Sequence, residues 1–267
     1  MITHYPDYYK EFKCIAGACK HTCCAGWEID VDKDSLQRFL EDPSIASHIE
    51  GNSIVLDKDE RCPFLNSDGL CDMILKHGED YICDICTEHP RFYNNYGDHI
   101  EAGLGLVCEE ACRLILERDT DFTLIPPLEL SLDIKTVFDT SKSLVSRLKE
   151  LKEDISSPVT RASFINTLEV MDPTWTPMID RIIKDPPSAA DEESLINSDQ
   201  RRFSNFCAYL LYRYPDEAGF AVEMTYLLAD LVITGNEILD AARMFSGEIE
   251  YSDINIDEAI IRFSDAD

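Results

Sequence analysis

The chain has 267 residues, 45% of them hydrophobic, and a formal net charge of −28. That length allows one large domain or two modest ones, with enough apolar material for a real core. So acidic a chain repels phosphate backbones, which argues against nucleic acid as a partner and suits a basic or lysine-bearing protein. An acidic surface kept for solubility explains the charge equally well.

The N-terminal residues MITHYPDYYKEFK lack the apolar core of a signal peptide. Residues 226–234 come nearest to a transmembrane segment, and Asp230 interrupts them. We therefore expect a cytoplasmic protein without a transmembrane segment. In a reducing cytosol, clustered cysteines favour metal binding or redox chemistry over disulfides.

The composition changes near residue 120, and residues 125–127 form a plausible hinge. We predict an α+β, mainly α fold: a cysteine-rich metal-binding module with short strands over residues 1–120, then an all-helical region over residues 128–267. In the first domain the hydrophobic patterns and turn residues predict short elements. In chain order they are a strand at 27–31, a helix capped by Asp34 and ending at Leu40, a strand at 53–56, a helix from Cys71 to Gly78, a hairpin of 92–96 with 99–106, and a helix at 109–117.

The second domain has helical periodicity throughout. An apolar stripe runs over residues 134–151, and residues 198–214 are apolar almost all round, which indicates a buried helix. Helices are also expected at 158–171, at 173–184 after an Asp172 cap, over 216–245 as one long helix or two shorter ones, and from Ser252 to Phe263, with a loop at 186–193.

Ten of the eleven cysteines and all six histidines precede residue 113. Thiolates are soft ligands that select zinc, copper(I) or iron–sulfur clusters, and each such centre usually takes about four ligands. Ten cysteines therefore exceed one site, so either there are two sites or some cysteines only line the first. Only Cys83-x2-Cys86 has zinc-finger spacing, and the triplet C-x3-C-x2-C of radical enzymes is incomplete after Cys19 and Cys23.

Several other residues have weaker signals. His21, His77 and His89 could ligate zinc, although local hydrogen bonding explains each of them better. Cys207 lies in an apolar helix and is expected in the core, whereas Cys112 fits a buried residue or a ligand equally well. Residues 101–106, EAGLGL, partly match the glycine loop of Rossmann-type methyltransferases, but a strand ending beside a cysteine is the better interpretation.

The cysteine segments resemble those of the flagellin lysine-N-methylase family and the wider group of putative zinc- or iron-chelating CxxCxxCC domains. The likeness is dense over residues 8–116 and thins in the helical half. Cys112 departs from the family pattern, and the chain is short for the family. The segments that carry the likeness are CIA at 14–16, TCCAGW at 22–27, RCPFL at 61–65, GLCD at 69–72, Cys83-x2-Cys86, HPR at 89–91, VCEEA at 107–111 and FCAYLLYRYP at 206–215.

This resemblance implies a methyltransferase that uses S-adenosylmethionine on lysines of flagellin, or of another lysine-bearing protein, in the cytosol. It also implies an iron–sulfur cluster, most simply [4Fe-4S], with zinc as the alternative metal. The ligands would come from one pool of cysteines, which the sequence does not divide between centres. The pool is Cys14, Cys19, Cys23, Cys24, Cys62, Cys71, Cys83, Cys86 and Cys108.

A lysine methyltransferase must first remove a proton, because a lysine ammonium with a pKa of about 10.4 has no lone pair for attack on a methyl group. Candidate bases near the cysteine segments are Glu101, Glu109, Glu110, Tyr93 and Tyr96, although a solvated carboxylate or a hairpin aromatic residue is the better explanation of each. No catalytic or donor-binding residue is assigned. Two other functions remain open: a non-catalytic zinc- or iron-chelating interaction domain, and an iron–sulfur redox protein.

Overall fold

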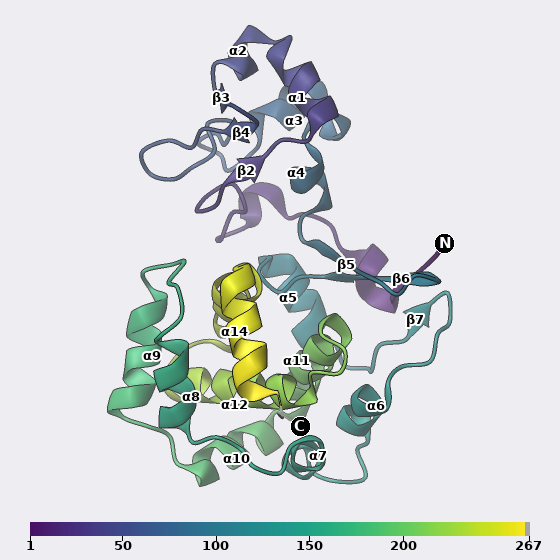
Figure 1. Cartoon of the computed structure of the whole chain (residues 1–267), viewed down its shortest axis with the longest axis vertical. Coiled ribbons are helices and arrows are strands. Elements are labelled where there is room, and N and C mark those ends of the chain that lie inside the picture. The colour runs from purple at the N-terminus through teal and green to yellow at the C-terminus, as the bar shows by residue number, and fades with distance from the viewer. Residues whose placement is uncertain (265–267) are drawn as a thin grey trace. The chain divides into compact units, whose positions relative to one another are not determined.

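The computed structural model describes residues 1–264, which pack as two compact units (Figure 1). Residues 13–91 form the first, here called the thiol unit, and residues 1–12 join the chain from residue 92 onward in the second, here called the helical unit. This division by packing differs from the division by composition between residues 120 and 128. The predicted domains 1–120 and 128–267 remain a prediction.

The thiol unit is built from short elements, as the sequence predicts. Its sheet has the order β2-β4-β3, with Ile29 opposite Ile54 and Ile49 also opposite Ile54. The predicted strands at 27–31 and 53–56 form over only two residues each. The strands are β2 (Ile29–Asp30), β3 (Ile49–Glu50) and β4 (Ser53–Ile54), and the helices are α1 (Lys33–Leu40), α2 (Pro43–Ala46), α3 (Asp72–His77) and α4 (Asp84–Glu88).

The residue that caps α1 is Asp32, so the predicted Asp34 cap is wrong. The Asp32 carboxylate accepts a hydrogen bond from the Ser35 amide at 2.8 Å, which satisfies one of the unpaired N–H groups of the first turn. The α3 prediction is confirmed: Cys71 is its N-cap, and Gly78 ends it with φ of 93°.

The helical unit contains one sheet of order β5-β6-β1-β7. The predicted hairpin is confirmed as β5 (Arg91–Asn95) and β6 (His99–Leu104). Two further strands have no predicted counterpart: β1 (Ile2–Pro6), which pairs in parallel with β6 so that His4 lies opposite Glu101, and β7 (Leu124–Ile125). Residues 101–104 are thus strand, and a Cβ on Gly103 would lie 2.2 Å from Phe92 Cζ, so this glycine allows close packing of a ring.

The remaining helices confirm the all-helical prediction for the chain after residue 128, with several corrected boundaries. The stripe at 134–151 is two helices, and the helix from Pro158 ends at Ile165. The predicted loop at 186–193 is confirmed at residues 186–188 but wrong from Ala189 onward, because Ser188 and Asp191 form a capping box that opens a helix. The helices are α5 (Glu109–Leu116), α6 (Leu132–Phe138), α7 (Leu144–Leu151), α8 (Pro158–Ile165), α9 (Trp175–Lys184), α10 (Ala189–Ser198), α11 (Gln200–Arg213), α12 (Ala218–Ile233), α13 (Ile238–Phe245) and α14 (Asp253–Phe263), with a π-helical turn at Ser246–Glu250.

Helix α9 begins at Trp175 rather than after Asp172, whose carboxylate accepts from the Thr174 amide at 2.8 Å. The predicted last helix is confirmed, with Ser252 as its N-cap. None of the helices within residues 1–264 is both long enough and apolar enough to cross a bilayer.

Helix α12 is the centre of the helical unit (Figure 1). It is buried from Gly219 to Leu231 and contacts α7, α8, α9, α10, α11, α13 and α14. Helix α11, predicted as buried, is buried from Phe203 to Tyr212 and packs against α5, α6 and α12. A helix with buried residues on every face must be enclosed by other elements on every side. The neighbouring helices enclose both α11 and α12 in this way.

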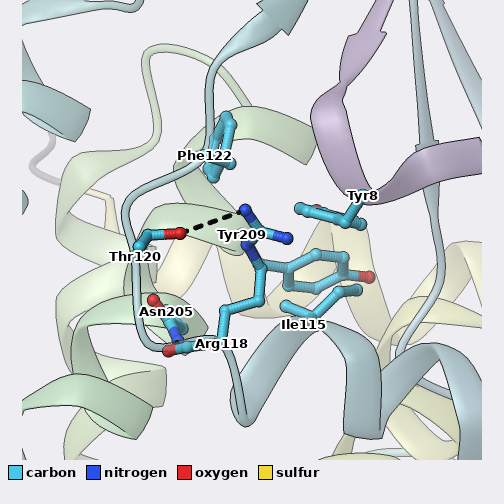
Figure 2. A pocket seen from close by; sticks show the side chains of 7 residues that line it. All are labelled: Tyr8, Ile115, Arg118, Thr120, Phe122, Asn205 and Tyr209. Carbon is cyan, nitrogen blue, oxygen red and sulfur yellow. Dashed lines mark hydrogen bonds between the residues drawn. The ribbon is translucent and has the colours of Figure 1, made fainter. Parts of the chain in front are cut away.

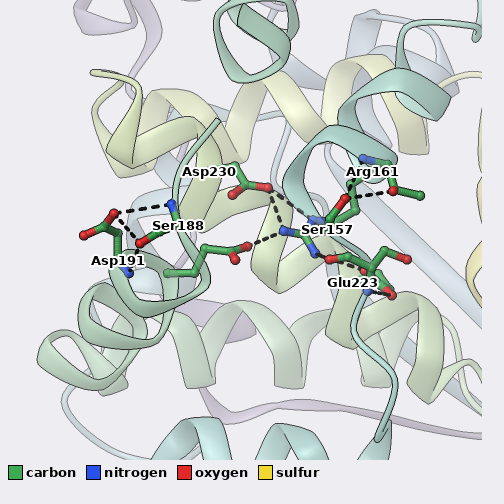
Figure 3. A network of polar contacts seen from close by, with 9 residues as sticks. Ser157, Arg161, Ser188, Asp191, Glu223 and Asp230 are labelled. Carbon is green, nitrogen blue, oxygen red and sulfur yellow. Dashed lines mark hydrogen bonds and ion pairs between the residues drawn. The ribbon is translucent and has the colours of Figure 1, made fainter. Parts of the chain in front are cut away.

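A buried ion cluster joins α8, α10 and α12 (Figure 3). The Arg161 guanidinium is 2.9 Å from an Asp230 oxygen and 3.2 Å from a Glu223 oxygen, and it also pairs with Glu192. The four side chains are between 0% and 4% exposed. Three carboxyl groups share one cation away from water, so burial raises the pKa of Glu192 to about 8 and raises that of Asp230.

Candidate metal centre

Backbone contacts bring two of the cysteine segments side by side. The Cys62 amide donates to the Cys24 carbonyl at 2.8 Å, and Ala25 bridges Arg61 in an antiparallel pair. The next segment folds back in a tight turn, in which Leu65 bridges Cys71. These contacts place cysteines that are 38 and 47 residues apart in sequence around one small core.

A second constraint sets the position of α4. The Asp32 carboxylate, which caps α1, also accepts from the Asp84 amide at 3.0 Å, directly after Cys83. The Asp84 and Ser35 amides lower the pKa of Asp32 to about 2. The sequence analysis missed this role of Asp32, although the pattern Asp32-x-x-Ser35 is a recognisable cap signal.

Five of the predicted ligands belong to the apolar core of the thiol unit. The thiols of Cys62 and Cys83 are buried, and three further cysteines are half-buried against the same core. Their neighbours in this core include Ile29, Val31 and Phe39. We call these five the thiol cluster, and they are Cys24, Cys62, Cys71, Cys83 and Cys86.

The pKa values of the cluster show that the sulfur atoms influence one another. Burial raises the pKa of Cys62 to about 12, and the charges of Cys24, Cys71 and Cys83 raise it further. A hydrogen bond from the Cys86 thiol lowers the pKa of Cys83, and the same bond raises that of Cys86. Thiolates crowded into an apolar core repel one another, and a bound cation would remove that repulsion.

Backbone N–H groups point at three of the sulfur atoms. The amide of Phe64 lowers the pKa of Cys62, those of Ile74 and Met73 lower the pKa of Cys71, and that of Cys86 lowers the pKa of Cys83, in each case against the effect of burial. Such bonds stabilise the thiolate form, which is the form that binds metal.

The donor set therefore fits a soft metal in atom type, burial and backbone support. The arrangement of side chains is not that of a finished site: among residues 1–264, no three His, Cys, Asp or Glu side chains are placed so that they could hold a metal ion. None of the eleven cysteines, all of which lie within residues 1–264, forms a disulfide.

The other four cysteines of the predicted pool lie elsewhere. Cys23 is exposed and reaches the cluster through a hydrogen bond with Cys24, which lowers the pKa of Cys24 to about 6. Cys14 is exposed and accepts from the Ala16 amide at 3.4 Å, and Cys19 is half-buried. Cys108 is the N-cap of α5 in the helical unit. The ligand role of all nine cysteines remains a prediction.

Two of the candidate histidines stack on aromatic rings, and the two remaining cysteines are buried in an apolar core. His77 stacks on Tyr81 at 4.0 Å, and His89 stacks on Trp27 at 6.1 Å. Burial lowers the pKa of His89 to about 4. Cys112 and Cys207 are buried in the core of the helical unit, as the sequence predicts for Cys207.

The predicted bases all lie in the helical unit. Glu109 and Glu110 begin α5, where Glu110 is paired with Arg113 at 2.7 Å. Tyr93 lies on β5 and is half-exposed. Glu101 and Tyr96 lie around a histidine on β6, described below.

The family-like segment at 206–215 ends in a polar cluster that the sequence analysis missed. The Arg213 guanidinium lies over the rings of Phe92, Tyr214 and Tyr251, at 4.8 to 5.6 Å, and is 3.4 Å from a Glu250 oxygen. Glu250 belongs to the π-helical turn, a type of element often found at functional sites. In the sequence, the arginine Arg213 followed directly by the aromatic residue Tyr214 was the signal that could have indicated this cluster.

A cavity of about 10 Å³ lies close to α11 (Figure 2). That volume holds about one water molecule and is far too small for a nucleoside. Arg118 crosses it and donates to Thr120 at 3.3 Å. The residues that line it are Tyr8, Ile115, Arg118, Thr120, Phe122, Asn205 and Tyr209.

Fold and site together define a class: an α+β chain in which a unit with a buried thiol cluster is inserted into a helical unit. Comparisons place it more closely. It is similar to the flagellar biosynthetic protein FliU of Salmonella muenchen, with 29% identity over 126 residues, which cover 42% of this chain and 75% of that protein. It is also similar to lysine-N-methylases of Salmonella typhimurium and Salmonella choleraesuis, each 28% identical over 126 residues.

These relatives confirm the resemblance that the cysteine segments indicate: the chain is related to the flagellin lysine methylase family. The match covers 31% of the length of each lysine-N-methylase. No family model matches the chain, and no solved structure matches it.

Proposed function

We propose that this chain is a protein-lysine methyltransferase of the flagellin lysine methylase type. The observation that carries the proposal is its similarity to two proteins named lysine-N-methylase and to a flagellar biosynthetic protein. S-adenosylmethionine is the proposed methyl donor, and lysines of flagellin, or of another lysine-bearing protein, are the proposed acceptors, in the cytosol. The net charge of −28 would attract a basic acceptor segment.

We further propose that the thiol cluster holds a metal centre, an iron–sulfur cluster of the [4Fe-4S] type or, failing that, zinc. Cys24, Cys62, Cys71, Cys83 and Cys86 are the residues that would hold it, with Cys14, Cys19, Cys23 and Cys108 as the remaining members of the pool. Such a centre supplies folding free energy and, if iron–sulfur, redox chemistry. The chain's own contribution is a set of buried and half-buried thiols, in which backbone N–H groups partly offset the rise that burial causes in the pKa of Cys62 and Cys71 and help to lower the pKa of Cys83.

The test is a methylation assay with anaerobically purified protein, flagellin of the same organism and S-adenosylmethionine carrying a labelled methyl group, together with iron, sulfide and zinc analysis. We expect label on flagellin lysines, and iron with sulfide in the wild-type protein. Cys83→Ser is expected to lose metal, while Cys207→Ala, which removes a thiol from the core of α11, keeps it. Stoichiometric zinc without sulfide would reject the iron–sulfur centre, and unlabelled flagellin would reject the methyltransferase.

A second candidate is a non-catalytic metal-binding protein or an iron–sulfur redox protein. The short match favours it, because less than a third of each lysine-N-methylase is shared with this chain. Titration calorimetry with S-adenosylmethionine separates the two: binding supports the methyltransferase, whereas a metal-loaded protein that binds no donor supports the alternative. Reversible reduction of a bound cluster without methyl transfer would identify the redox protein.

A further inference from the structure

Four polar side chains meet at the start of β6, all within the helical unit. His99 Nδ1 is 2.7 Å from an Asp98 oxygen, and its Nε2 is 3.6 Å from a Glu101 oxygen. Tyr96 stacks on the His99 ring at 4.8 Å, with the two planes 8° apart. The ring is thereby held between two carboxylates, one at each nitrogen.

His4 supports this cluster from the neighbouring strand. The parallel pairing of β1 with β6 places it opposite Glu101, and its ring is edge-on to His99 at 5.5 Å. Its Nδ1 donates to the Pro126 carbonyl at 2.7 Å, so in the neutral ring the proton is on Nδ1, and Nε2 has a lone pair.

The exposure of the side chains rises step by step along the cluster. It is 14% for Glu101, 23% for His99 and 87% for Asp98. A half-buried carboxylate is thus connected through an imidazole to a carboxylate in water. Burial raises the pKa of Glu101, while His99 and His4 act in the opposite direction, and Asp98 raises the pKa of His99. The other titratable groups that act on Glu101, Tyr96 or both are Tyr212 and Asp216.

We propose that Glu101 is the base that accepts the proton of the acceptor lysine's ammonium group, and that His99 conducts this proton to solvent. This inference rests on the proposed lysine methyltransferase. The half-exposed Tyr96 ring adds a face on which a cation is attracted. Of the five candidates from the sequence, Glu101 and Tyr96 belong to this cluster, whereas Glu110 forms an ion pair with Arg113.

The proposed step balances in protons and electrons. The ammonium N–H bond breaks, the proton goes to a Glu101 oxygen, and the electron pair stays on nitrogen. That pair forms a bond to the methyl carbon of a sulfonium donor, whose carbon–sulfur bond breaks with its electrons left on sulfur. Glu101 then passes its proton to His99 Nε2, and the Nδ1 proton leaves through Asp98 to water.

Histidine NMR tests the ammonium site without any methyl transfer. In the full-length protein, the ¹³C-labelled His99 signal, assigned with His99→Gln, is followed during titration with Nα-acetyl-lysine methylamide. We expect a saturable shift that Glu101→Gln abolishes, that the exposed control Glu129→Gln retains, and that Nα-acetyl-norleucine methylamide does not produce. An unshifted signal, or the same shift in Glu101→Gln, overturns the proposal.

Methyl transfer tests the role as a base. Glu101→Gln is expected to slow transfer to flagellin by roughly 10²- to 10⁴-fold, the usual contribution of a general base, and Glu129→Gln to leave it unchanged. His99→Gln is expected to move the acidic limb of the pH–rate profile, with partial rescue by added imidazole. An active wild-type protein with an equally active Glu101→Gln variant overturns the base. A wild-type protein that binds the lysine amide at His99 but transfers no methyl group rejects the methyltransferase and keeps the ammonium site.

Discussion

The two units of the chain are stabilised in different ways. The apolar core of the thiol unit contains nine buried residues, two of them cysteines, beneath helices of four to eight residues. The helical unit surrounds α12 and α11 with other helices and buries charged side chains completely, each with a partner. Helices so short are marginal without tertiary support, so we expect the thiol unit to depend on its cysteines for stability, whereas the helical unit has a core of packed helices and a buried ion cluster.

Removing the proposed metal is the strongest way to break this comparison. Loss of a structural thiolate centre costs on the order of 10 kcal/mol, and we expect that loss to affect residues 13–91 alone. Hydrogen exchange with mass spectrometry, with and without a chelator, measures both units in one experiment. Amides of residues 13–91 that stay equally protected would show that apolar packing alone stabilises the unit.

Arg161→Met tests the helical unit in the same way. The variant leaves three buried carboxyl groups without their cation, so we expect a loss of about 3–5 kcal/mol in the free energy of unfolding. Urea unfolding measures it. The control Arg113→Met removes a half-exposed cation paired with Glu110 and should cost at most about 1 kcal/mol. If the two variants lost the same free energy of unfolding, the buried ion cluster would stabilise the helical unit no more than a surface ion pair does.

Gly103→Ala tests how much the packing of the sheet contributes to the stability of the helical unit. The new methyl group would lie 2.2 Å from the Phe92 ring, and such overpacking costs about 1–3 kcal/mol. Gly247→Ala is the matched control, because its nearest neighbour, Val107 Cγ2, is 3.7 Å away. Thermal unfolding of the two variants decides the matter, and similar melting temperatures would contradict the role of Gly103.

Glu192→Gln should have the smallest effect, visible as a change in pH dependence. Burial raises the pKa of Glu192 from 4.5 to about 8, so the folded state binds an extra proton and its stability falls as the pH rises through that window. Between pH 7 and pH 8, the upper end of that window, the loss is about 1 kcal/mol, or ~2–4 °C in melting temperature. The glutamine variant should lack this slope, and an identical slope would place the titration on another group.

Part of the difference between the two units can be predicted from the sequence, because one region is rich in cysteines and the other has helical periodicity. The cysteine spacing predicted a module over residues 1–120, a wider range than the thiol unit at 13–91, and helical periodicity predicted α11, α13 and α14. Local chemistry also gave α3, whose Cys71 and Gly78 mark its two ends. The flagellin lysine methylase resemblance followed from the same cysteine segments.

What the sequence did not reveal depends on distant residues. Strand β1 has no strong pattern of its own and exists because β6 and β7 pair with it. The cap of α1 follows from the local pattern Asp32-x-x-Ser35, but the second bond of Asp32, to the Asp84 amide 52 residues away, has no local signal. The proximity of His4 to His99 and Glu101 likewise depends on the parallel register of two strands that lie almost a hundred residues apart in the chain.

That parallel register has a consequence for the order of folding during synthesis. The first strand leaves the ribosome before residues 13–91, yet its partners are residues 99–101 and 124–125. Since domains fold as they emerge, the inserted unit can complete its fold while the N-terminal strand still has unpaired edges. Strand β1 is therefore exposed to nascent-chain chaperones until residues 99–101 and 124–125 have emerged.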